Sequence, residues 1–150
     1  MAKKYNVKKL ENDKSNHIYH VILNLEDDQY NILKDGVILL KDWVYYIDYT
    51  ECNLNTQTFT FVEVVSEQYN CVNRNGEFLF KDNFKNYAYL ENFTRIKLNN
   101  NTTTLINSLG QILDTVFNET IYVENDIIKN IDGGAELGKI GIDFKFINNK

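Results

Sequence analysis

Proline is absent from this 150-residue sequence, and alanine and methionine are scarce. Turns must therefore be made by glycine, aspartate and asparagine, and asparagine supplies 22 residues, many of them between apolar stretches. Strong helix formers are few, whereas the β-branched and aromatic residues that suit a pleated, half-buried surface are abundant. The composition predicts an all-β protein, with a short helix only near the N-terminus or around residues 133–139.

The sequence also has no long apolar run and only two cysteines, Cys52 and Cys71. A membrane-spanning helix needs about 20 apolar residues, and the lysine-bearing start lacks the apolar core of a secretory signal. Two cysteines do not make a disulfide framework, so Cys71 is expected to be a small buried apolar residue. We therefore expect no membrane contact and a cytoplasmic location, which would be the host cytoplasm if a phage encodes the chain.

Positive charge is in the minority, because the net charge is −5 although the first 14 residues carry +3. The remaining chain is acidic, which argues against direct nucleic-acid binding, since proteins that bind the phosphate backbone cluster Lys and Arg. We expect a single domain over residues 1–150. It would consist of a basic N-terminal segment at 1–16, solvated or facing an acidic partner, and a β-repeat body at 17–146.

An internal repeat is the most informative feature. Residues 59–79 meet residues 93–113 when the sequence is shifted by 34 without a gap, and the match brings Gly76 onto Gly110. Both stretches have an apolar-alternating segment, a polar turn that is Asn-rich in the second, and a short segment that ends in Asn three residues before the glycine. Two short strands joined by a few residues with glycine at the positive-φ position form a β-hairpin.

Two further copies are less complete. Residues 30–42 match residues 69–82 with a shorter Asp-Gly turn, and the extra residues between these copies fall in a polar stretch expected to be a longer loop, 51–57. Residues 127–131 and 138–146 lie where a fourth copy should recur. The expected turn glycines are Gly36, Gly76, Gly110 and Gly141. Because one hairpin alone is marginal, we predict three to four antiparallel hairpin-like repeats of about 34–40 residues, stacked or rolled into a barrel-like single domain.

The repeat unit resembles that of the WG-repeat (KWG-repeat) family of β-rich proteins. The local matches are Lys139-Ile140-Gly141-Ile142-Asp143 and the stretch from Tyr69 to Gly76, and the resemblance extends over roughly residues 18–146. Proteins of this family occur in bacteria and their phages. The resemblance implies a binding scaffold and no reaction.

Motifs for catalysis, metal binding or cofactor binding are missing. His17 and His20 have the spacing i, i+3, but the following residues predict a strand, in which they would point to opposite faces. Adjacent carboxylates such as Asp27 and Asp28 lie in predicted loops, and no serine has the surroundings of a nucleophile. The glycines of residues 133–141 lack the Lys-Ser/Thr ending of a phosphate loop, so we expect turns there, with a ligand-contacting loop as the alternative. The sequence predicts no enzyme, no metal and no cofactor.

Two aromatic stretches, residues 43–49 and 83–93, are the candidate interaction surfaces. A strand over 43–49 would place Trp43, Tyr45, Ile47 and Tyr49 on one face and Val44, Tyr46 and Asp48 on the other. Tyrosine and tryptophan are favoured at interfaces, although the same residues could instead fill the core between repeats. The interface candidates are Trp43, Tyr45, Tyr46, Tyr49, Phe84, Tyr87 and Tyr89.

Three functions are compatible with these features. We expect a non-catalytic β-repeat module that binds a protein partner, either as a scaffold or adaptor or by self-association into a homo-oligomer. The alternative is an inhibitor of a host defence protein, similar to an anti-CRISPR protein, which is encoded by a phage or mobile element and acts through its acidic surface. A further alternative is a small-molecule or nucleotide binder, with its site near the glycine cluster or between repeats.

Overall fold

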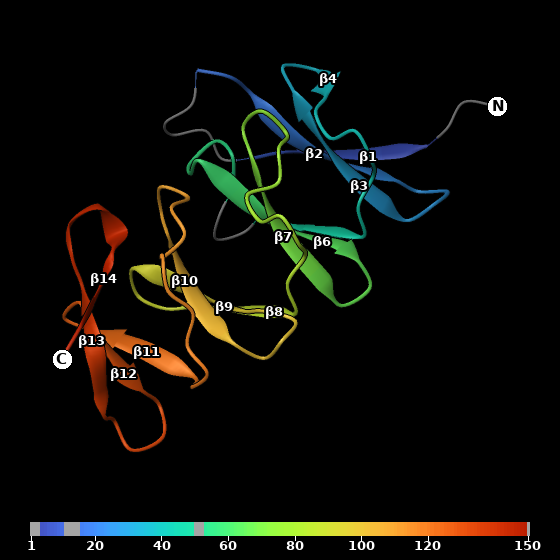
Figure 1. The fold of residues 1–150 in the computed structure, drawn as a ribbon. Coiled ribbons are helices and arrows are strands. Elements are labelled where there is room, and N and C mark those ends of the chain that lie inside the picture. The colour runs from blue at the N-terminus through green and yellow to red at the C-terminus, as the bar shows by residue number, and fades with distance from the viewer. Residues whose placement is uncertain (1–3, 11–15, 50–52, 150) are drawn as a thin grey trace. The chain divides into compact units, whose positions relative to one another are not determined.

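The computed structural model describes residues 4–10, 16–49 and 53–149 (Figure 1). In these ranges the chain is β-structure, with one 3-10 turn at Ile142–Phe144 and no α-helix, so the predicted all-β class is confirmed. Among the described residues, no helix is long and apolar enough to cross a membrane. The chain forms two compact units, Met1–Asn83 and Phe84–Lys150.

The first unit contains two antiparallel sheets, with strand orders β1-β2-β3-β4 and β5-β6-β7. Its strands are β1 (Tyr5–Lys9), β2 (Tyr19–Asn24), β3 (Gln29–Lys34), β4 (Val37–Ile38), β5 (Tyr46–Asp48), β6 (Phe59–Val65) and β7 (Gln68–Asn73). The second unit also contains two, with orders β10-β9-β8 and β11-β12-β13-β14. Its strands are β8 (Asn86–Tyr89), β9 (Phe93–Lys97), β10 (Thr103–Asn107), β11 (Ile121–Glu124), β12 (Ile127–Asn130), β13 (Glu136–Ile140) and β14 (Phe146–Asn148). The described strands thus form four separate sheets and do not close into the barrel-like alternative.

Each sheet corresponds to one copy of the sequence repeat. Phe59 pairs with Asn73 in the second sheet, and Phe93 pairs with Asn107 in the third, which is the same register displaced by 34 residues. The amide of Leu79 donates to the carbonyl of Cys71 at 2.9 Å, and the amide of Leu113 donates to that of Leu105, also at 2.9 Å. The repeat inferred from the sequence is therefore a repeat of backbone hydrogen bonds.

The turn glycines Gly76 and Gly110 have matching conformations. Both have a φ of +81°, and each donates its amide to the carbonyl of the Asn three residues before it, at 3.0 Å. Gly36, with a φ of +84°, makes the tighter turn of the first copy. Gly141 differs from the prediction, because its φ of −98° is extended. The positive φ of the fourth copy falls instead on Phe144, 34 residues after Gly110.

A buried asparagine ties the end of each early copy to its own sheet. The Asn31 side chain donates to the carbonyl of Leu40 and accepts the amide of Leu40, both at 3.0 Å. Asn70 makes the same pair of contacts with Phe80, at 3.1 and 3.2 Å. These two hydrogen bonds explain the Tyr-Asn pair that both copies share. One asparagine amide can satisfy one backbone donor and one backbone acceptor of the segment that follows the hairpin.

Each unit has its own apolar core, supplied by the inward faces of its two sheets. The core of the first unit is formed by Leu10, Tyr19, Val21, Ile32, Leu40, Val44, Ile47, Leu54, Val62 and Val72. That of the second is formed by Leu105, Leu113, Phe117, Ile121, Ile128 and Phe144. Cys71 is fully buried, as predicted, whereas Cys52 lies outside the described residues.

Three local expectations need correction. The part of the basic N-terminal segment that the structure describes is not a solvated tail, since β1 pairs with β2 over its whole length. Residues 133–139 form a turn and part of β13 rather than a helix. The described part of the polar loop at 51–57 is turn structure, but Leu54 and Asn55 within it are fully buried, so that it is part of the core.

Asp114 links β14 to the third sheet and predicts a dependence of stability on pH. The amide of Phe146 donates to Asp114 at 2.9 Å, and this bond is the largest cause of the lowered pKa of that carboxyl. A carboxyl with a lowered pKa in the folded chain stabilises it above the ordinary pKa, and this stabilisation is lost as the pH falls through the folded pKa. We expect the urea midpoint followed by circular dichroism to fall less in Asp114→Asn than in the parent between about pH 5 and pH 3. Equal losses would contradict this assignment.

Candidate functional site

Four aromatic side chains of the first unit form two ring pairs, Tyr5 with Trp43 and Tyr30 with Tyr46, and we call these four residues the aromatic surface. The ring of Tyr5, on β1, stacks on Trp43 with centroids 6.2 Å apart and planes inclined by 25°. Tyr30, on β3, meets Tyr46, on β5, edge to face at 5.2 Å. Tyr5 and Tyr46 remain 43% and 41% exposed. Rings from two sheets and the segment joining them are thus held in two pairs, each of which still reaches solvent.

A pair of backbone hydrogen bonds fixes the segments that carry these rings. Val44 and Tyr30 exchange both amide–carbonyl hydrogen bonds, at 2.8 and 3.0 Å, so the segment before β5 is fixed to the preceding sheet. Trp43 lies immediately before the bridge and Tyr46 two residues after it. The buried Val44 holds the bridge in the core. The position of both ring pairs is therefore set by main-chain geometry.

The predicted faces of residues 43–49 were wrong. Val44 and Ile47, three residues apart, are both buried, whereas Tyr45 and Tyr46 are both exposed. Strict alternation is lost because Val44 pairs with the first sheet, while the amide of Tyr45 already donates to Glu63 of the second, at 2.9 Å. The segment changes partners between these two residues. A period of two assumes one continuous strand, so it could not predict this change.

Two phenols of the second sheet, those of Tyr46 and Tyr69, have a raised pKa. Burial is the largest cause of the raised pKa of Tyr46, and Tyr49, Asp48 and Tyr30 add to it. Tyr69 follows Tyr46 and Glu63 along one row of the sheet, and its pKa is also raised, by burial first and then by Glu63 and Glu67. A neutral phenol presents a hydroxyl donor beside an apolar ring, which is the combination that makes tyrosine effective in recognition.

Positive charge lies beside the aromatic surface. Every residue of β1 is exposed, including Lys8 and Lys9, and the ammonium group of Lys8 lies 4.9 Å from the ring centre of Tyr49. Tyr49 itself is half-buried against the core of the first unit. Exposed lysines thus lie on the same strand as Tyr5, in a chain with a net charge of −5.

The second aromatic stretch belongs to the other unit and is less exposed. Phe84 is fully buried, which removes it from the interface candidates. Tyr87 is half-buried between Phe84 and Tyr89, with ring centres 6.2 and 5.7 Å away, and Tyr89 is 38% exposed. Of this group only Tyr89 presents a substantial part of its ring to solvent.

Sequence reasoning missed Tyr5 and Tyr30, which complete the aromatic surface. Tyr5 was hidden in a segment expected to lie outside the β-body, and only its place on β1 brings it to Trp43. Tyr30 was noted as part of the Tyr-Asn pair shared between copies, and this shared tyrosine was the available signal. Its ring is placed by the contact with Tyr46, which no sequence period encodes.

His17 and His20 have different surroundings. His17 lies before β2 and bonds Asp35 at 2.6 Å on the surface, whereas His20 lies within β2. The pKa of Asp35 is lowered, first by the amide of Ile18 and then by His17. Among the described residues, no three His, Cys, Asp or Glu side chains are grouped to hold a metal. In the glycine cluster, Gly133 and Gly134 have positive φ in the turn between β12 and β13, as the turn interpretation predicts.

No protein-family model and no curated protein matches this sequence. Two solved structures of computationally designed proteins are similar to it. The Ika8 protein is 11% identical with a TM-score of 0.35 over 83% of this chain, which spans only 43% of the Ika8 chain. The Ika4 protein is 13% identical with a TM-score of 0.34, over 85% of this chain and 92% of that one.

Proposed function

We propose that this chain is a non-catalytic protein-interaction module of the cytoplasm that contacts its partner through the aromatic surface. The observation that carries the proposal is the assembly of Tyr5, Tyr30, Trp43 and Tyr46 from separate segments into two ring pairs that remain partly exposed. Aromatic side chains supply most of the binding energy where they anchor an interface, because they bury a large area.

Preorganisation favours binding at this surface. Each ring packs against another ring, and the segment between them is fixed by the Tyr30–Val44 bridge. Side chains that are already held in one rotamer lose little conformational entropy when a partner covers them, whereas each flexible side chain costs about 1 kcal/mol to order. The aromatic surface is therefore suited to contact a partner without rearrangement.

The surrounding charge indicates what kind of protein would fit. The exposed lysines of β1 lie beside the rings and would face the rim of an interface, where opposite charge guides association. A partner with an apolar centre and an acidic rim is complementary. A second copy of this chain offers such acidic surface, so self-association is the simplest form of the proposal. Lysines on the exposed edge of β1 disfavour direct pairing of two β1 strands.

Site-specific photo-crosslinking in cells that express the chain tests the proposal. A photoreactive phenylalanine at position 46 should give a discrete crosslinked band, whose mass tells a second copy from another protein. The same group at Val37, which is 68% exposed on β4 of the same unit, should not give that band. Replacing Tyr5 with serine removes the stack on Trp43 and should weaken the interaction roughly tenfold or more, as truncation of an anchoring aromatic does.

Two outcomes would contradict the proposal. One is an identical crosslinking pattern from positions 46 and 37, which would mean that the aromatic surface is no more engaged than ordinary exposed surface. The other is an undiminished band at position 46 after Tyr5→Ser in a chain that still folds. The folded state of that variant can be verified from its circular dichroism spectrum.

A further inference from the structure

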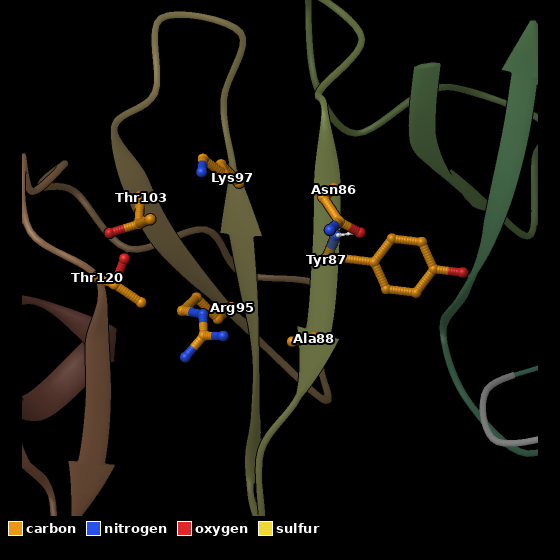
Figure 2. Close-up of a pocket in the computed structure, with 7 residues that line it drawn as sticks. All are labelled: Asn86, Tyr87, Ala88, Arg95, Lys97, Thr103 and Thr120. Atoms are coloured by element: carbon orange, nitrogen blue, oxygen red, sulfur yellow. Dashed lines mark hydrogen bonds between the residues drawn. The ribbon is translucent and has the colours of Figure 1, made fainter. Parts of the chain in front are cut away.

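The second unit contains a pocket whose polar lining is made of hydrogen-bond donors. It has a volume of about 180 Å³ and lies against β8, β9 and β10 with Thr120 at its border (Figure 2). Arg95, Lys97, Asn86, Thr103 and Thr120 supply its polar groups, and no aspartate or glutamate lines it. In a chain with a net charge of −5, a pocket with two cations and no carboxylate is unexpected.

Strand register places the two cations on one side of the sheet. Arg95 and Lys97 alternate with Ile96 along β9, so both side chains leave the same face. Figure 2 shows them leaving β9 on the side of Thr103 and Thr120, while the ring of Tyr87 points the opposite way. Like charges held this close repel each other, and an anion between them would relieve the repulsion.

The cations keep free donors. Arg95 donates from Nη1 to the carbonyl of Ile121 at 3.0 Å, which fixes the guanidinium group while its other N–H groups remain available. Within the described ranges, neither Arg95 nor Lys97 forms an ion pair. The ammonium group of Lys97 also makes no hydrogen bond to any described residue.

The neutral groups of the pocket add two more donors. The Oδ1 atom of Asn86 accepts the amide of Tyr87 at 2.8 Å, so its Nδ2 group is left to donate. The hydroxyl of Thr103 is already committed, since it donates to the carbonyl of Glu119 at 2.7 Å. The Thr120 hydroxyl has no such commitment among the described residues. A fixed guanidinium, an ammonium, an amide and a hydroxyl therefore surround one small space.

From this geometry we infer that the pocket binds a phosphate group. A guanidinium fork and a neighbouring ammonium are the groups that proteins use for tetrahedral oxyanions, and charge-assisted hydrogen bonds to them are the stronger kind. Two cations match a dianion better than a monoanion. The site lies wholly in the second unit, so it is independent of the aromatic surface and of the function proposed for it.

Titration of the isotopically labelled chain with inorganic phosphate, followed by NMR, tests the inference. Chloride must keep the ionic strength constant, because exposed charges are screened by salt. We expect saturable shifts of the amides of Arg95, Lys97 and Thr120. Lys97→Gln should weaken the affinity roughly tenfold, the loss of about one charge-assisted hydrogen bond. Lys85→Gln is the matched control, since Lys85 bonds Asn101 on the same sheet outside the pocket, and it should bind as the parent does.

Further titrations identify the ligand and include results that would contradict the inference. Adenosine monophosphate separates the sources: tighter binding than inorganic phosphate assigns the site to the phosphate group of a larger molecule, and equal binding to the free ion. Acetate should bind at least tenfold more weakly than phosphate, and equal affinity would overturn the assignment to phosphate. Shifts that do not saturate, or that are the same in Lys97→Gln and Lys85→Gln, would overturn the site itself. Arg95→Lys, which keeps the charge, should retain more affinity than Arg95→Gln.

Discussion

Replacing Asn55 with alanine is expected to destabilise the first unit by about 4 kcal/mol, a large share of the stability of a small domain. The Asn55 side chain is fully buried and accepts the amide of Tyr19 at 3.2 Å. It also donates to the carbonyls of Leu10 and Tyr19, at 3.1 and 3.2 Å. The carbonyl of Tyr19 would keep its bond from the amide of Leu10, but the buried Tyr19 amide and Leu10 carbonyl would each lose the bond they make to Asn55. Each such group costs about 1–3 kcal/mol.

The measurement is urea unfolding followed by the fluorescence of Trp43, which reports on the first unit alone. Asn75→Ala is the matched control, because Asn75 is exposed in the turn before Gly76 and its side chain reaches only Glu77, at 3.5 Å. We expect that control to change stability by less than about 0.5 kcal/mol. Similar midpoints for Asn55→Ala and Asn75→Ala would contradict a structural role for the buried amide, and with it the assignment of the 53–57 loop to the core.

Gly76→Ala is expected to cost about 3 kcal/mol, whereas Gly36→Ala is expected to cost about 1 kcal/mol. Both glycines have positive φ, +81° and +84°, so both substitutions strain the backbone similarly. The two positions differ in the space available for an added Cβ atom. A Cβ at Gly76 would lie 2.8 Å from the carbonyl oxygen of Leu39, and 3.3 Å from its Cγ, while a Cβ at Gly36 would meet nothing within 4 Å. The excess cost of Gly76→Ala therefore measures the close packing of the first sheet on the second.

Trp43 fluorescence serves here as well, since both glycines belong to the first unit. A second substitution, Leu39→Ala, removes the side-chain part of the clash and should recover part of the excess in Gly76→Ala, while leaving the Gly36→Ala difference unchanged. Equal costs for the two glycine substitutions would show that the two sheets do not approach each other at Gly76, and the stacking of repeats in this unit would have to be abandoned.

For the candidate interface residues, the sequence predicted their identity better than their exposure to solvent. The identity of Trp43 and Tyr46 as candidates came from composition alone, since a run of aromatic residues is conspicuous in any sequence. Composition did not show which of these residues face solvent. The segment changes partner strands after Val44, so the predicted faces of 43–49 were wrong. Phe84 stands in an equally aromatic stretch and is nevertheless fully buried. Aromatic character predicts a large buried area and does not tell core from interface.

The phosphate pocket was not foreseen, although its alternation is visible in the sequence. Arg95 and Lys97 flank Ile96 on a predicted strand, and this pattern alone describes an ordinary solvated face. What makes it a site is the arrival of Thr120 and the carbonyl of Ile121, which lie 23 to 26 residues further along the chain than Arg95 and Lys97. Contacts at such separation depend on how one sheet packs on the next, and no local period records that packing.

By itself the sequence determined the all-β class, the 34-residue register of the two middle copies and the glycines at three of the turns, because these depend on local backbone preferences and on spacing along one hairpin. The tertiary structure decided which aromatic rings meet and remain exposed, that Asn55 closes the core, that residues near the N-terminus form a strand, and that the chain divides into two units. These features arise from contacts between segments far apart in the chain, whose free energy depends on burial and on partners that neighbouring residues do not specify.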